Sequence, residues 1–495
     1  RTTPSLLVGS GQTRRDLGNL GNLFFKPDLA FATPKVVVSL AVHVSRPAAM
    51  AGADRKAIAI ERLMNVVAAK VVLEAINADS YAATLAGFTY EVSFEERGWY
   101  LEVHGFAHKL KLLLTTLCRG LHQLSVTVCD ELVLKRILDQ QQLTLANAHF
   151  SPSSLVTHER LRCLDEKTNT PQEMLDALDA LTPASLTAHV AATLSRGVHC
   201  EAYIGGNVVA AEAVDLLETA HEALGSPPAL TPPPPLEMCG ALPAGILARR
   251  EVVGVNPSDE NCAVDIYWQL GADDSDAEAS GRVALLEHLM YEPLFDTLRT
   301  KQQLGYTVGC SARNTHGALG FCLSVVSATH TPVDVEARAL AFLRQFIDDL
   351  RAMKPAEFAT NVRAATANRL LADKSIEDEA HRYWLEIDVR QYRFERAEEE
   401  AAAMRSVSQE ELATWADAVL LSAAARQLTV VVHARAGPAK AEPSAKPSPE
   451  LSAELSASAV PSAELSAELG SSVESMQEDP RAGRKSQDKR QDKRR

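Results

Sequence analysis

Two stretches of the chain repeat one order of hydrophobic and polar positions. The first begins with KVVVSLAVHV (35–44), where apolar side chains fall on one face at the two-residue period of a β-strand. A helix is expected next, because apolar residues recur at helical spacing: Ile60, Leu63, Met64, Val67 and Val71. FTYEVSF (88–94) and WYLEVHG (99–105) flank a turn and predict a hairpin. After several helices, HCEAYIGG (199–206) predicts a closing strand.

The second stretch follows the same order. NCAVDIYWQL (261–270) alternates like a strand, and an amphipathic helix is expected from about Glu278 to Leu298. GYTVGCSAR (305–313) and FCLSVVSA (321–328) predict a second hairpin, and QLTVVVHA (427–434) a second closing strand. The fold class is therefore α+β, with two homologous domains. Each domain is expected to be a mainly antiparallel sheet covered by helices on one face.

Composition divides the chain into five segments. Four consecutive prolines lie within 225–240, which cannot continue a helix or a central strand and is interpreted as an extended linker. The linker separates the domains 23–224 and 241–436. Residues 437–495 repeat Ser, Ala, Pro and Glu without aromatics and end in a basic run, so we expect a disordered tail. Residues 1–22 are expected to be a flexible N-terminal segment.

Charge and cysteine usage narrow the class of protein. The formal net charge of -14 argues against nucleic acid as a partner, because binding phosphates needs a basic face. Eight cysteines without a C-x-x-C pair are typical of reduced thiols in an intracellular protein. The sequence has no apolar run long enough to predict a membrane span. Its first residues also lack the apolar core of a secretory signal. We expect a cytoplasmic location, with mitochondria or another organelle left open.

Motifs for a complete catalytic site are missing from the sequence. The helix of the second block carries Ala284-Leu-Leu-Glu287-His288, which is the zinc pattern H-x-x-E-H with Ala284 at its first histidine. One His and one Glu cannot supply a three-ligand catalytic zinc site, so we expect no metal to be held by this chain. The G-x-S-x-G nucleophile motif and the G-x-G-x-x-G dinucleotide motif are also absent.

One junction between a helix and a strand departs from ordinary packing. In EPLFDTLRTKQQLGYTV (292–308), Arg299 lies in the last turn of the helix and Tyr306 enters the strand. A basic residue at a helix C-terminus complements the helix dipole, which is a structural reason for Arg299. Aligned on the same junction, the first block has Tyr90 opposite Tyr306 but Ala83 opposite Arg299. The arginine is therefore peculiar to the second block.

These residues carry a resemblance to a known family. EPLFDTLRTKQQLGYTV resembles the signature of the fourth domain of the zinc metallopeptidases of the insulin-degrading enzyme, nardilysin and pitrilysin type. LFFKPDLAFATPKVVVSLAVHVSRP (23–47) and YAATLAGFTYEVSFEERGWYLEVHGF (81–106) resemble the family's third domain. The resemblance covers roughly residues 20–435. It implies two of four homologous α+β domains that close around a peptide, without the first domain, which holds the zinc.

The resemblance implies a function for the junction. Arg299 and Tyr306 would contact the substrate backbone at the scissile bond, and Phe295 would line the pocket just beyond it. The chain would be the substrate-binding, non-zinc half of a zinc metalloendopeptidase, inactive without a zinc-bearing N-terminal half in the same or a separate chain. A first residue other than Met favours a fragment of a longer product. The alternative is a non-catalytic peptide-binding or scaffold subunit, and homodimerisation stays open.

Overall fold

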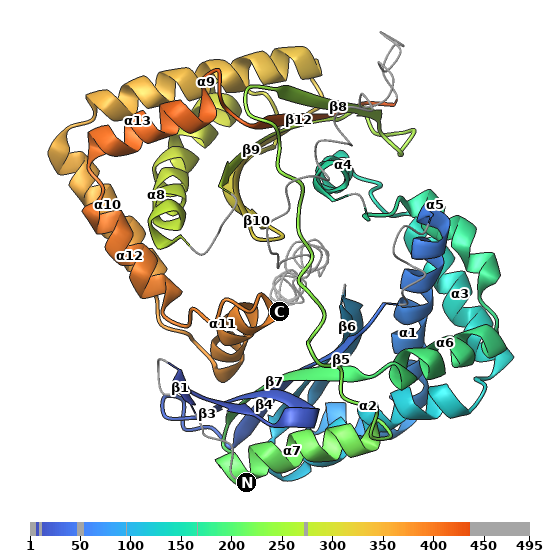
Figure 1. Ribbon diagram of the computed structural model, residues 1–495. Coiled ribbons are helices and arrows are strands. Elements are labelled where there is room, and N and C mark those ends of the chain that lie inside the picture. The colour runs from blue at the N-terminus through green and yellow to red at the C-terminus, as the bar shows by residue number, and fades with distance from the viewer. Residues whose placement is uncertain are drawn as a thin grey trace, which may run out of the picture.

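The structure is a computed structural model that describes six ranges of the chain: 6–8, 12–46, 54–95, 97–165, 167–271 and 276–435. The tail expected over 437–495 lies outside the described residues. Two sheets lie on opposite sides of the molecule, each with helices on its outer face (Figure 1).

The first sheet has seven strands in the order β1-β2-β3-β7-β4-β6-β5. Their bounds are β1 Leu6–Val8, β2 Gln12–Asp16, β3 Gly21–Pro27, β4 Lys35–Val44, β5 Thr89–Glu95, β6 Gly98–Phe106 and β7 Val198–Gly206. β3 pairs with β7 in parallel, and the other neighbours are antiparallel. β4 and β7 are buried along nearly their whole length, which agrees with a central position in the sheet.

The second sheet has five strands in the order β10-β11-β9-β12-β8. Their bounds are β8 Leu247–Val253, β9 Cys262–Gly271, β10 Thr307–Thr315, β11 Ala318–Ser327 and β12 Gln427–His433. β12 and β8 are parallel, as β7 and β3 are in the first sheet, and the remaining pairs are antiparallel. The order β12-β9-β11-β10 thus repeats β7-β4-β6-β5. The predicted α+β class with two homologous domains is confirmed.

Helices cover the outer face of the first sheet: α1 Arg55–Leu85, α2 Ala107–Val126, α3 Glu131–Ala146, α5 Pro171–Ala177, α6 Pro183–Ser195 and α7 Ala210–Ala223. Leu63 and Val67 of α1 and Leu117 of α2 pack with Leu40 of β4 and Trp99 of β6, all fully buried. In the described ranges no single helix is long and apolar enough to cross a membrane; α2 and α3 meet that criterion only together, across a bend of 108°.

A second set of helices covers the outer face of the second sheet: α8 Ala277–Leu294, α9 Pro332–Ala352, α10 Pro355–Arg369, α12 Arg396–Ser406 and α13 Gln409–Leu420. The core between them contains Trp268 of β9, Phe321 of β11, Leu286 of α8 and Leu343 of α9, none of which reaches solvent. Asp276 caps α8 by accepting hydrogen bonds from the backbone N–H groups of residues 278 and 279. The two domains therefore have separate cores.

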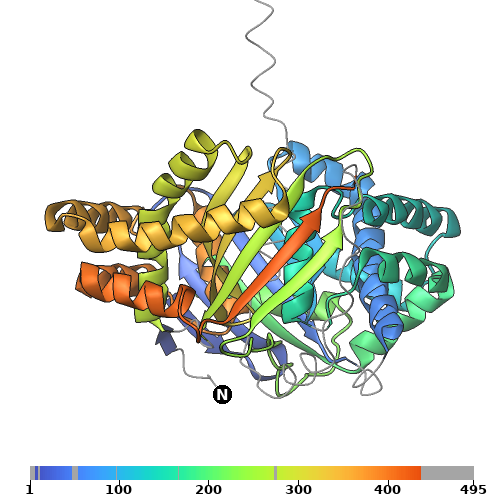
Figure 2. The same ribbon diagram turned by 90° about the horizontal axis from the view of Figure 1, so that it is seen from above.

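One helix of each domain packs on the inner face of the other domain's sheet. α11 (Ile376–Asp388) belongs to the second domain but packs on the first sheet, and α4 (Pro152–Leu164) of the first domain packs on the second sheet (Figures 1 and 2). The face of α11 repeats at helical spacing: Ile376, Ala380, Tyr383, Trp384 and Ile387. Its contacts include Trp384 on Tyr100, with 5.2 Å between ring centroids. This exchange interlocks the domains, and the sequence did not predict it.

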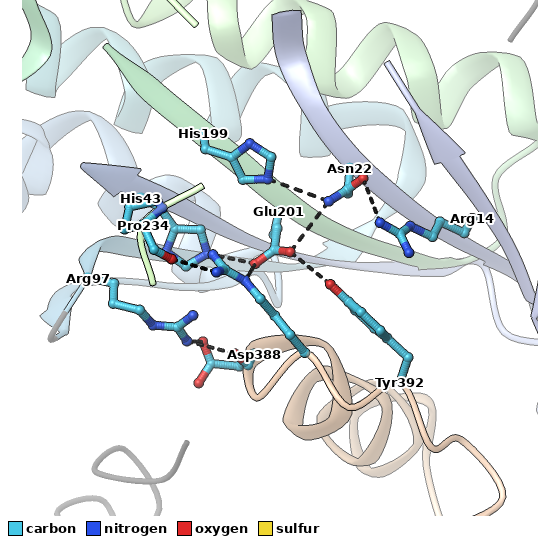
Figure 3. A network of polar contacts seen from close by, with 10 residues as sticks. Arg14, Asn22, His43, Arg97, His199, Glu201, Pro234, Asp388 and Tyr392 are labelled. Carbon is cyan, nitrogen blue, oxygen red and sulfur yellow. Dashed lines mark hydrogen bonds and ion pairs between the residues drawn. The ribbon is translucent and has the colours of Figure 1, made fainter. Parts of the chain in front are cut away.

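A buried polar network joins α11 and the turn after it to the first sheet (Figure 3). The Glu201 carboxylate of β7 accepts hydrogen bonds from Arg390 Nε at 3.1 Å and Tyr392 Oη at 3.2 Å, and lies 2.9 Å from His43 Nε2. Burial alone would raise the pKa of Glu201, but His43 and Arg390 outweigh it and the pKa is lowered. Burial lowers the pKa of His43 to about 4, so its imidazole is neutral at pH 7.

One segment differs from the sequence expectation. Residues 12–16, expected to lie in a flexible N-terminal segment, form β2 and pair with β3, because the first sheet still has an open edge there. The expected linker 225–240 makes contacts with both domains. Arg390 Nη1 donates to the Pro234 carbonyl at 2.6 Å, and the backbone N–H of Gly240 donates to the Leu164 carbonyl at 2.8 Å.

Candidate substrate-binding site

The helix α8 continues directly into a short π-helix, η4 (Phe295–Lys301), which ends at the site. The wider turn is visible in its closing hydrogen bond, from the N–H of Gln302 to the carbonyl of Thr297 at 2.9 Å. Leu298 is fully buried and anchors the turn in the core. Gln303 then takes a positive φ of 54°, which reverses the chain toward β10. Single π-turns of this kind are frequent at functional sites.

The three site residues expected from the sequence lie together. The guanidinium carbon of Arg299 is 4.5 Å from the ring centroid of Phe295 and 5.9 Å from that of Tyr306. Tyr306 is 89% exposed, while Arg299 and Phe295 are half-buried. Among the residues that the structure describes, none accepts a hydrogen bond from the Arg299 guanidinium or the Tyr306 hydroxyl. Two aromatic rings therefore lie beside a cation whose N–H donors have no acceptor among the described residues.

Gly305 sets the position of the neighbouring Tyr306. A Cβ atom at residue 305 would lie 1.9 Å from the carbonyl oxygen of Val326 in β11, far inside van der Waals contact. Only glycine allows this close approach of the two strands. Gly309, the third residue of β10, has open space instead, with no heavy atom within 4 Å of its Cβ position.

The equivalent junction in the first domain serves packing. The Tyr90 hydroxyl lies 2.6 Å from Ser80 Oγ of α1, and the ring packs against the core. Tyr306 at the matching position of the second domain has no such partner among the described residues and is almost fully exposed. The same local structure thus holds one tyrosine inward and one outward. The Tyr90 hydroxyl already has a hydrogen-bond partner, as polar groups inside proteins normally do. The exposed Tyr306 hydroxyl is therefore the one available to a ligand.

The zinc pattern that lacks its first histidine does not form a metal site. Glu287 Oε2 of α8 accepts a hydrogen bond from the N–H of Ala312 at 3.0 Å. Within the six described ranges no three His, Cys, Asp or Glu side chains lie close enough to hold a metal ion. The eight cysteines are all free thiols. One His and one Glu in this helix do not fit a catalytic zinc ion, which needs three protein ligands.

A large cavity begins one helical turn before the site, and the sequence did not predict it. It has a volume of about 1280 Å³, and Tyr291 and Glu292 of α8 belong to its wall. Its other walls come from the strands β10 and β11, from the helices α10, α11 and α12, and from the segments that join these helices. Because these segments are spread over 280–404, no local pattern in the sequence could have indicated the cavity.

Two family models match the chain. Residues 17–177 match the middle or third domain of peptidase M16, and residues 285–384 match domain 4 of the C-terminal lobe of the PQQ synthase PqqF-like proteins. The chain belongs to the M16 peptidase family. It corresponds to the C-terminal half of an M16 protein. The resemblance stated from the sequence is thereby confirmed.

Relatives of this M16 chain include longer proteins. It is 27% identical over 424 residues to "Insulin-degrading enzyme-like 1, peroxisomal" of Arabidopsis thaliana. The aligned residues cover 83% of the chain and 42% of that protein. It is 30% identical over 398 residues to human nardilysin, covering 80% of the chain and 33% of nardilysin. The chain thus spans less than half the length of these two relatives.

Solved structures share the fold of this M16 chain. Pitrilysin aligns with a TM-score of 0.77 at 20% identity, covering 90% of the chain and 46% of pitrilysin. A protein from Pseudomonas fluorescens described as a peptidase M16 inactive domain aligns with a TM-score of 0.61 at 13% identity, covering 87% of the chain and 99% of that protein. At these identities the likeness establishes the fold alone.

Proposed function

We propose that this M16 chain is the substrate-binding, non-zinc half of a zinc metalloendopeptidase, and that it holds the peptide backbone through Arg299 and Tyr306. The observation that carries the proposal is the stack of Phe295, Arg299 and Tyr306, with an exposed phenol and a guanidinium that has no hydrogen-bond partner among the described residues. The zinc of such an enzyme would be bound by the other half.

The chemistry of the two groups suits a peptide in an extended conformation. A guanidinium is a rigid fork of donors that can hold peptide carbonyl oxygens in place. Stacking on Phe295 and Tyr306 restricts its side-chain rotamers before substrate arrives, which lowers the entropy lost on binding. A phenol aimed at the scissile carbonyl stabilises negative charge that develops on its oxygen. This chain would therefore position the peptide and stabilise its transition state without initiating hydrolysis.

The test uses this chain assembled with the zinc-bearing N-terminal half of an M16 relative and a quenched fluorescent peptide as substrate. We expect Arg299→Ala and Tyr306→Phe each to lower the cleavage rate, by about 10²–10³ for a donor that acts on the transition state. Tyr90→Phe is the matched control, because it removes the same hydroxyl from the corresponding junction of the first domain. Full activity in either site variant, or cleavage by this chain alone, would contradict the proposal.

The second candidate is a peptide-binding or scaffold subunit that never takes part in catalysis. It is favoured by the lack of a metal-binding group among the described residues and by the fold likeness to a protein described as an inactive domain. Such a subunit would bind peptides through Arg299 without accelerating their cleavage in any assembly. Unchanged peptide hydrolysis on adding this chain to the zinc-bearing half, together with retained peptide binding, would select this candidate.

A further inference from the structure

The helices α9, α10, α12 and α13 meet at one corner of the second domain, where a groove of about 800 Å³ lies between them (Figure 1). The end of α9, the first half of α10, and the turn from α12 into α13 line this corner groove. Its larger apolar side chains belong to the core of the second domain or pack against it: Met353, Phe358, Val362 and Val407. The volume is within the range of pockets that bury ligands, about 300–1000 Å³.

Two arginines line the corner groove at the same level, one on α10 and one on α12. The two helices are antiparallel: an ion pair joins Arg369 to Glu400 near one end, and the start of α13 bonds to the turn before α10 at the other end. Arg363 lies six residues before Arg369 on α10, and Arg405 lies five residues after Glu400 on α12. Because the helices are antiparallel, both arginines are displaced from the ion pair by about 7–9 Å in the same direction.

The charge of these two arginines is not compensated within the described residues. Arg363 Nη2 donates only to the neutral Thr360 hydroxyl, at 2.9 Å, and Arg405 has no ion pair in the described part of the chain. Both side chains are exposed. The third arginine of the lining, Arg351, is in ion pairs with aspartates of α9 and α13 and also attracts Glu410, the one acidic residue of the lining. Beside α10 and α12 the groove therefore has an apolar floor and a positive rim.

The C-terminal segment of the chain contains a repeat with the complementary chemistry. PSPELSAELSAS (447–458) and PSAELSAELGSS (461–472) each contain two Glu-Leu pairs four residues apart, and neither copy has a Lys or Arg. A spacing of four would place both leucines on one side of a helix, with the glutamates next to them. Such a Glu-Leu repeat matches an apolar groove with a basic rim, since amphipathic segments bind grooves through their apolar side.

The chain is long enough to bring this repeat to the corner groove. Gln409 belongs to the groove lining, and Arg435 is the last described residue. The chain between them contains α13, about 18 Å long, and 15 further residues, so the two points are at most about 70 Å apart. The segment from Arg435 to Leu465 extends to about 100 Å. The second copy of the repeat therefore reaches the groove, whatever the direction in which the chain leaves β12.

We propose that one copy of the Glu-Leu repeat docks in the corner groove of its own chain, with its leucines on the apolar floor and its glutamates beside Arg363 and Arg405. The tether holds the repeat near the groove at an effective concentration of about the millimolar range, so a weak contact is enough for occupancy. The contact attaches the C-terminal segment to the second domain. It is independent of the function proposed for Arg299.

The test is photo-cross-linking of the full chain with p-benzoyl-phenylalanine in place of Leu465, followed by mass spectrometry of the digested product. We expect cross-links to 353–363, at the start of α10, or to 405–410, between α12 and α13. Isotopically labelled and unlabelled chains are mixed before irradiation, which distinguishes a cross-link within one chain from one between two copies. The expected cross-links join residues with the same isotopic label.

Charge reversal separates a specific contact from a general effect on the fold. The groove variant Arg363→Glu/Arg405→Glu should lower the cross-link yield about fivefold or more, because two attractive pairs become repulsive. The tail variant changes the four glutamates of the repeat to lysine: Glu450, Glu454, Glu464 and Glu468. It should lower the yield equally, and combining both variants should restore it. Arg344→Glu is the matched control, because this exposed arginine of α9 lies outside the groove lining and should keep the yield.

Two results would overturn the proposal. One is a set of cross-links that miss the groove or join only chains of different isotopic label; the latter would assign the groove to the tail of a second copy. The other is a yield that neither charge reversal lowers, or that the combined variant fails to restore. Equal melting temperatures establish that the groove variant is folded. Because the tail variant changes no described residue, it tests the contact even where the groove variant does not fold.

Discussion

The network around Glu201 allows a quantitative test of how the two domains are held together. Glu201 is almost fully buried and faces Arg390 at 3.1 Å, and Arg390 belongs to the second domain. Replacing Glu201 by Gln keeps the volume but removes the charge, and turns an N–H₂ group toward one of the donors. Breaking a buried ion pair by removing one partner costs about 3–5 kcal/mol, because the other charge stays buried. Since Gln keeps one acceptor oxygen, we expect about 3 kcal/mol.

The assay is urea unfolding at pH 7, followed by tryptophan fluorescence. Of the four tryptophans, Trp99 reports on the first core, Trp268 and Trp415 on the second, and Trp384 on the contact of α11 with the first sheet. The interlocked helices predict that all of them report one transition. Asp215→Asn is the control, because its ion pair with Lys111 at 2.5 Å is exposed and should contribute less than about 1 kcal/mol. A loss in Glu201→Gln no larger than in this control would refute the reasoning.

Two further predictions concern pH and strand packing. The folded pKa of His43 is lowered to about 4 from its ordinary 6.5, so its contribution to stability is present above pH 6.5 and is lost as the pH falls toward 4. The free energy of unfolding should therefore fall more steeply over this range in the wild type than in His43→Gln; equal slopes would contradict this. Gly305→Ala should destabilise the protein by about 1–3 kcal/mol and weaken peptide binding, because its Cβ would lie 1.9 Å from the Val326 oxygen. Gly309→Ala is its control, and equal effects of the two variants would disprove the packing argument.

The sequence predicted the elements whose apolar period is local. The alternation in 35–44 and 261–270 matches β4 and β9, because one face of each strand is buried against its own domain's helices. The strands β3 and β8, each of which pairs in parallel with its domain's closing strand, were not predicted. Their partners β7 and β12 lie some 180 residues away in sequence. The spacing of apolar residues within a strand does not indicate which distant strand it pairs with. For the same reason the apolar face of α11 gave no indication that it covers the other domain's sheet.

The candidate site was partly predictable. Arg299, Tyr306 and Phe295 could be named because they lie within twelve consecutive residues and match a family signature. What the sequence could not give is the direction of each side chain: Tyr90 and Tyr306 occupy equivalent positions, yet one bonds to Ser80 and the other faces outward. That difference is decided by tertiary packing and not by the local sequence. The same holds for the walls of the cavity beside α8.

The claim that Arg299 and Tyr306 act together on one peptide is tested most directly by a double-mutant cycle in the assembled enzyme. The measured quantity is kcat/KM for the wild type, Arg299→Ala, Tyr306→Phe and the double variant. We predict that each single change lowers kcat/KM at least tenfold and that the double variant loses less than the product of the two. A single variant with wild-type kcat/KM would contradict the claim.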